Sequence, residues 1–150
     1  MEKKLSCLLS KLRSYFQRFG YWCEPYGDYL FYGKVKVTTV HTTFFLEDYR
    51  FHDYLYLFGK DATKFKGLEE LKNLSDRLIN TTGDHRTSTF TLLLFGEKTQ
   101  NFQSLYMEKS ILFGFKGKKR LGICFLSDEI ECPCELKDVK DFLLSLVGRG

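Results

Sequence analysis

The sequence predicts an α+β fold, with helices packed on one face of a largely antiparallel sheet. Segments with apolar residues three and four positions apart, typical of amphipathic helices, alternate with runs of β-branched and aromatic residues, typical of strands. Short turns separate the strand-like runs, which favours antiparallel pairing. Because no repeat, linker or change in composition interrupts this pattern, we expect residues 1–150 to form a single domain.

The main expected helices lie at the N-terminus, in the middle and at the C-terminus of the chain. The first spans residues 3–19, where leucine and phenylalanine recur at helical spacing until Gly20 ends it. The second, at about 66–80, has a stripe of leucines, and the last, at about 135–147, has leucine, valine and phenylalanine at the same spacing. A short additional helix is expected at about 99–108.

The expected strands fill the segments between these helices. The run Phe90–Phe95 is apolar at nearly every position, so it is expected to lie at the centre of the sheet. Between residues 40 and 58 we expect two strands, separated by a turn at the polar pair His52-Asp53. The predicted element order is αββββαβαβββα, with strands at 21–24, 29–37, 42–50, 54–59, 87–95, 110–116, 120–126 and 130–132.

Composition excludes several classes of protein. Hydrophobic residues make up 43% of the chain and charged residues 28%, which is typical of a globular domain and not of a disordered segment. No apolar run reaches the ~20 residues of a membrane helix, and Lys11 and Arg13 interrupt the apolar segment that a secretion signal would need. Five scattered cysteines do not match a secreted disulfide framework. We therefore expect a cytoplasmic protein that does not contact membranes.

The positive charge is concentrated in two short segments. The formal net charge is +4, and residues 1–20 and 109–120 are both strongly basic, the second without any acidic residue. Residues 117–119 are expected to form the tip of a hairpin. Such a basic tip can attract a polyanion, so we predict a non-enzymatic binding module that contacts nucleic acid or an acidic protein. The predicted binding residues are Lys116, Lys118, Lys119 and Arg120. Alternatively, these residues only keep a surface turn soluble.

An enzyme of unknown class is the second hypothesis. His85 lies in a polar cluster before the predicted central strand, and polar residues at the end of a buried strand are well placed to line a cleft. The candidate catalytic residues are His85, Glu47 and Asp48, in a hydrolase-like site. A degenerate, metal-dependent nuclease-like site would combine Glu47 and Asp48 with Lys60. Either site requires its groups to meet in one pocket.

We expect no metal and no cofactor. Cys132 and Cys134 could bind a metal together with Cys124 and His85. Structural zinc sites, however, have two closely spaced pairs of ligands, and this chain has only one such pair. Structural cysteines in the core explain the pattern better.

Aromatic residues are unusually abundant. The chain has 15 Phe, 9 Tyr and 1 Trp, which together make up 17% of its residues. A surplus of large apolar side chains often marks an interface, so a homo-oligomer is a further expectation.

Four short segments follow a pattern that extends over about two-thirds of the chain. They are Thr43–Leu46, His52–Leu55, His85–Thr89 and Lys109–Gly117. Together they resemble an uncharacterised prokaryotic protein family, mainly archaeal, although the family's Gly-Trp step is Gly117-Lys118 here. The family has no assigned activity. The resemblance therefore implies a microbial cytoplasmic protein and no particular mechanism.

Overall fold

The computed structural model describes residues 2–41, 49–78, 85–96, 105–111, 117–127 and 129–147. In chain order, the described elements are α1 (Glu2–Phe19), β1 (Gly20–Cys23), β2 (Phe31–His41), β3 (Tyr49–Asp61), η1 (Ala62–Lys64), α2 (Leu68–Leu78), β4 (His85–Phe95), β5 (Tyr106–Ile111), β6 (Gly117–Leu126), β7 (Ile130–Glu131), η3 (Cys134–Leu136) and α3 (Lys137–Val147).

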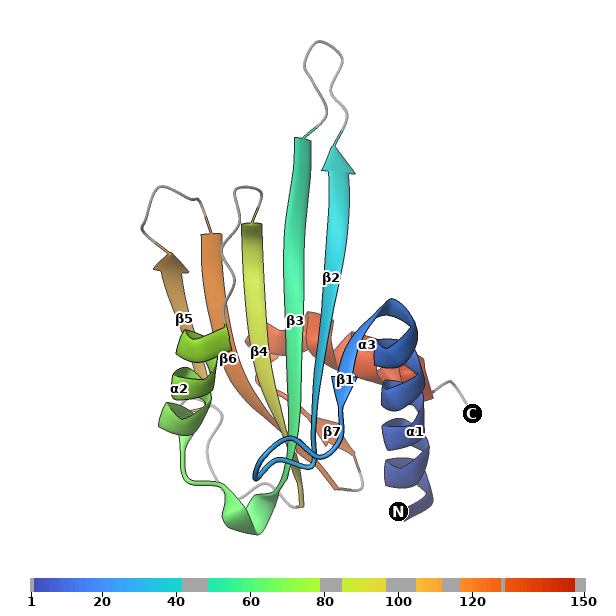
Figure 1. Ribbon diagram of the computed structural model, residues 1–150. Helices are drawn as coiled ribbons and strands as arrows, with labels where there is room; N and C mark the ends of the chain where they lie inside the picture. Colours follow the sequence, from blue (N-terminus) through green and yellow to red (C-terminus); the bar gives the residue numbers. More distant parts are fainter. Residues whose placement is uncertain are drawn as a thin grey trace.

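All the described strands belong to one mixed sheet, which confirms the α+β class. The strand order is β1-β2-β3-β4-β6-β5, and β7 also pairs with β6 (Figure 1). The outer pairs are antiparallel, whereas β3–β4 and β4–β6 at the centre are parallel. Parallel neighbours need a connection that crosses back along the sheet, and α2 lies in this connection between β3 and β4. Strands β3, β4 and β6 therefore all begin at the same end of the sheet.

Helices cover both faces of the sheet, so the expectation of a single covered face was wrong. In Figure 1, α2 lies in front of the sheet and α3 behind it. Side chains alternate along a strand, and each central strand therefore contributes to two cores. Phe58 belongs to the same core cluster as Leu71 of α2, whereas the adjacent Leu57 belongs to the cluster that contains Leu12 of α1 and Leu143 of α3. We call the two sides the α2 face and the α1/α3 face.

The predicted turn at His52-Asp53 was also wrong, because both residues lie inside the continuous strand β3. The polar pair coincides instead with an irregularity in the parallel pairing of β3 with β4. His52 pairs with His85 and Asp53 pairs with Thr87, which leaves Arg86 as an extra residue in β4. A bulge and a turn both interrupt an apolar pattern with polar residues, so the sequence alone does not separate them.

The predicted helix at 99–108 was wrong at its C-terminal end. Residues from Tyr106 onward form β5, which pairs with the first half of β6; residues 97–104 lie outside the described residues. Tyr106 is paired with Gly122, and the ring of Tyr106 and the side chain of Leu136 both pack against this glycine. Pairing with β6 and this close packing outweigh the helical spacing of the local sequence.

Gly122 leaves no room for a larger residue. A Cβ atom at this position would overlap Cδ1 of Leu136, which is fully buried just before α3. We expect Gly122→Ala to lower the free energy of unfolding by about 1–3 kcal/mol in urea denaturation. Leu136→Ala removes the obstacle, so the double variant should lose less than the sum of the two single variants. Additive losses would contradict this explanation.

Candidate functional site

The predicted binding residues lie in a strand and point to opposite sides of the sheet. Because β6 begins at Gly117, Lys118, Lys119 and Arg120 belong to this strand and not to a hairpin tip. Lys116 lies outside the described residues. Successive strand residues alternate between faces, which places Lys119 on the α2 face and Lys118 and Arg120 on the α1/α3 face. The three described residues therefore do not form one continuous patch.

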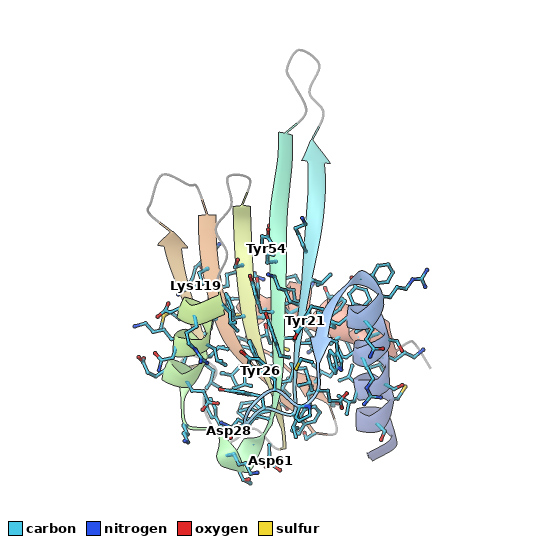
Figure 2. All side chains as sticks on the ribbon, in the orientation of Figure 1. Tyr21, Tyr26, Asp28, Tyr54, Asp61 and Lys119 are labelled. Atoms are coloured by element: carbon cyan, nitrogen blue, oxygen red, sulfur yellow. The ribbon has the colours of Figure 1, made fainter. Side chains whose placement is uncertain are left out.

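Lys119 is held by α2 (Figure 2). Its Nζ atom lies 2.7 Å from Oδ1 of Asp76, and its side chain is only 8% exposed. A buried ammonium group requires a partner of this kind, because an unpaired buried charge is costly. Lys119 therefore joins β6 to α2 and presents little surface to a binding partner.

Arg120 makes a corresponding connection on the α1/α3 face. Its Nε donates to Oγ1 of Thr89 over 3.1 Å, and its Nη2 donates to Oδ2 of Asp138 over 2.7 Å. Its Nη1 donates to the backbone oxygen of Glu135 over 3.3 Å. The planar guanidinium thus joins four elements at once, β6, β4, η3 and the start of α3. Arg120 holds α3 on the sheet.

Lys118 is the accessible member of the three. Its side chain is 47% exposed, and it pairs with Glu108 of β5, which is 43% exposed. Exposed ion pairs of this kind contribute little to stability, so Glu108 can be replaced by another anion.

Sheet pairing brings basic residues from five strands to one end of the sheet. We call this region the strand-start half, because β3, β4 and β6 begin there. It comprises residues 34–41, 49–56, 85–90, 107–111 and 117–121. Two acidic residues lie in these ranges, Asp53 and Glu108, against eight basic ones. The basic residues are Lys34, Lys36, Arg50, Arg86, Lys109, Lys118, Lys119 and Arg120. Positive charge in the strands is therefore concentrated at the end where β3, β4 and β6 begin.

The predicted binding residues include only three of these eight cations, and Lys34 and Lys36 of β2 are among the five that sequence reasoning missed. Lys36 is exposed. Lys34 Nζ lies 5.5 Å and 5.3 Å from the ring centroids of Tyr54 and Tyr56, a cation–π arrangement. These lysines alternate with apolar residues, which is the pattern of an ordinary strand. The pairing of β2 with β3, of β3 with β4 and of β4 with β6 places them in the same half of the sheet as Lys118, and no local signal could have revealed this long-range pairing.

The structure describes one of the three candidate catalytic residues, His85. His85 is the first residue of β4 and pairs with His52 of β3. Glu47 and Asp48 lie outside the described residues. They precede Tyr49 in the sequence, and Tyr49 begins β3 at the end of the sheet where β4 begins with His85. Catalysis by these three residues stays a prediction.

The nuclease-like combination with Lys60 is not compatible with this fold. Lys60 lies near the opposite end of β3, roughly 36 Å from Tyr49 at about 3.3 Å per residue. Its Nζ atom is 2.8 Å from Oε1 of Glu70 and 4.9 Å from the ring centroid of Tyr29. The Tyr29 hydroxyl also donates to Oε1 of Glu70 over 3.0 Å. Lys60 therefore belongs to a buried network at the other end of the molecule.

A cavity of about 240 Å³ lies on the α1/α3 face of the strand-start half. We call it the α3 pocket. Its apolar lining comes from α1, β2, β3 and α3, and its polar lining from β3, β4 and α3. The lining side chains include Tyr15, Val35, Leu55, Val139 and Phe142, with Asp53, Thr89 and Asp138 as the polar members. Arg120 fixes two of these polar members, Thr89 and Asp138.

The cysteines do not form a metal site within the described residues. Cys124 is buried, and burial together with contact to the Cys132 thiol raises the pKa of its thiol well above the usual value. Cys134 is exposed and lies in η3. In the described part of the chain, no group of three or more His, Cys, Asp or Glu residues is arranged to hold a metal.

The fold and the site thus define an α+β domain with a basic strand-start half and an adjoining pocket. No family model matches this chain, and no curated protein or solved structure is significantly similar to it. The resemblance to the archaeal family stays a prediction. Within the described ranges, no helix has the length and apolar character needed to span a membrane.

Proposed function

We propose that the protein binds nucleic acid through the strand-start half of its sheet, without catalysing a reaction. The supporting observation is the gathering of eight basic and two acidic residues from five strands at one end of the sheet. Lysine and arginine bind nucleic acid by neutralising backbone phosphates and releasing their counterions. We place this activity in the cytoplasm.

The accessible cations are the expected phosphate contacts. Lys36 is exposed on the α2 face, and Lys118 is exposed on the α1/α3 face. Cations on both faces of the same end favour a nucleic-acid strand that passes across the end of the sheet. Lys119 and Arg120 hold α2 and α3, and their charges are paired with those of Asp76 and Asp138, so they are not expected to contact phosphates.

Other residues at the two ends of the sheet agree with this orientation. Figure 2 shows Tyr54 toward the strand-start half, and Asp28 and Asp61 at the opposite end. Hydrogen bonds from the hydroxyl and backbone N–H of Thr63 hold the pKa of Asp61 below its usual value, so this residue stays negative. These carboxylates lie beside Lys64 and Lys66, so the opposite end carries charges of both signs, whereas cations predominate along the strands of the strand-start half.

The salt dependence of binding tests the proposal. We expect fluorescence anisotropy with labelled oligonucleotides to give a linear fall of log K with log salt. Each phosphate contact contributes roughly 0.7–0.9 to this slope, so Lys36→Glu/Lys118→Glu should reduce it by about 1.5. The matched control is Lys64→Glu/Lys66→Glu, which changes charge equally on exposed residues beyond the other end of β3.

Three results would contradict the proposal. Absence of binding at low salt excludes nucleic acid as the partner. Equal losses in the test variant and the control show that only net charge matters. Polyglutamate that competes as well as the oligonucleotide would indicate an acidic protein partner.

A further inference from the structure

We infer that the α3 pocket holds one unpaired nucleobase of a single-stranded nucleic acid. The inference rests on the proposed function and specifies which form of nucleic acid is bound. Three features support it: the apolar walls of the pocket, the carboxylates at its rim and the position of Lys118.

The walls of the α3 pocket suit the flat faces of a base. Tyr15 and Phe142 form an edge-to-face pair with ring centroids 5.0 Å apart, and Val35, Leu55 and Val139 add apolar surface. Aromatic and apolar side chains of this kind contact the π-face of any base. The volume of about 240 Å³ lies below the ~300–1,000 Å³ of pockets for drug-sized ligands, so one ring system is the appropriate occupant.

The rim of the pocket can distinguish between bases. Asp53 and Asp138 present carboxylates from β3 and α3. Oδ2 of Asp138 accepts a hydrogen bond from Arg120, but a carboxylate has about four lone-pair sites and can accept others. Aspartate accepts hydrogen bonds from the exocyclic amino group of cytosine, whereas uracil and thymine have no such amino group. The pocket should therefore prefer cytosine to uracil or thymine.

Lys118 places a positive charge beside the pocket. Pairing aligns Asp53, Thr87 and Lys118 in one row across β3, β4 and β6. With neighbouring strands about 4.8 Å apart, the Cα atoms of Asp53 and Lys118 are about 10 Å apart. The flexible lysine stem can span the remaining distance to the phosphate of a nucleotide whose base occupies the pocket. From there the strand continues over the strand-start half.

Calorimetric titrations with cytidine 5′-monophosphate, uridine 5′-monophosphate and inorganic phosphate test the pocket directly. We expect the cytidine nucleotide to bind about tenfold or more tightly than the other two. Leu55→Phe, which fills the pocket, and Asp53→Asn, which weakens its acceptor, should each reduce this affinity about tenfold. Neither variant should change the salt slope for oligonucleotides. Asp28→Asn, at an exposed position far from the pocket, is the matched control.

The experiments distinguish a failure of this inference from a failure of the proposed function. Salt-dependent oligonucleotide binding without mononucleotide binding, and without any effect of the pocket variants, overturns the inference and leaves the proposed function intact. Absence of oligonucleotide binding overturns both. Equal affinity for cytidine monophosphate and inorganic phosphate shows recognition of phosphate alone, which also overturns the inference.

Discussion

Replacing Lys60 with methionine is expected to lower the free energy of unfolding by about 3–5 kcal/mol. The side chains of Lys60 and Glu70 are only 7% and 10% exposed, and Nζ lies 2.8 Å from Oε1. The variant leaves the Glu70 carboxylate buried without its counter-charge. Tyr29 and the backbone N–H of Lys66 remain as donors, the latter over 3.3 Å to Oε2, but neither carries a charge that neutralises it.

Urea denaturation of a variant series checks this expectation. Lys64→Met removes an equal charge from an exposed residue close in sequence, and its effect should stay within about 0.5 kcal/mol. Lys60→Met/Glu70→Leu removes both charges, so it should be more stable than Lys60→Met alone. A double variant that is less stable than the single one would show that desolvation of Glu70 is not the cause.

The protein is expected to lose stability steeply above pH 10, because folding raises the pKa of buried tyrosines. Burial and the neighbouring Tyr56 raise the pKa of Tyr32, and burial and the hydrogen bond to Glu70 raise the pKa of Tyr29. Unfolded tyrosine loses its proton near pH 10. Above that pH the unfolded chain binds fewer protons than the folded chain, so the free energy of unfolding falls as pH rises. Below pH 10 this stabilisation is fully present.

The expected loss for the well-buried Tyr32 is about 1.4 kcal/mol between pH 8 and pH 11, and Tyr29 adds to it. Denaturation curves at both pH values measure the loss. Tyr32→Phe and Tyr29→Phe remove the titrating groups, so the double variant should have a smaller difference between the two pH values than the wild type. An unchanged difference would contradict the assignment to these tyrosines.

The local patterns of the sequence were informative, and the long-range pairing was not. Apolar spacing located α1, α2 and α3, because a helix face depends on residues a few positions apart. The apolar run at Phe90–Phe95 correctly indicated a central strand, since β4 is covered on both faces. The parallel pairing of β4 with β3 and β6 joins distant segments, and no short pattern specifies it.

In the candidate site, too, local patterns could be recognised in the sequence and long-range pairing could not. The composition of segment 109–120 showed that it is basic. Because residues 117–119 were predicted to form a turn, however, the alternation of side chains along a strand was not expected there, and this alternation places Lys119 and Arg120 on opposite faces. Lys36 and the α3 pocket depend entirely on which strands become neighbours. Their contribution to the candidate site could be recognised only after the strand order and register were known.

The adjacent residues Lys119 and Arg120 together fix the register of β6 in the sheet. One is bonded to a helix in front of the sheet and the other to a helix behind it. Sliding β6 by one residue would exchange the two side chains between faces and break both bonds simultaneously. Neighbouring alignments of this strand therefore carry a double electrostatic penalty, and two consecutive residues determine how all three layers of the protein fit together.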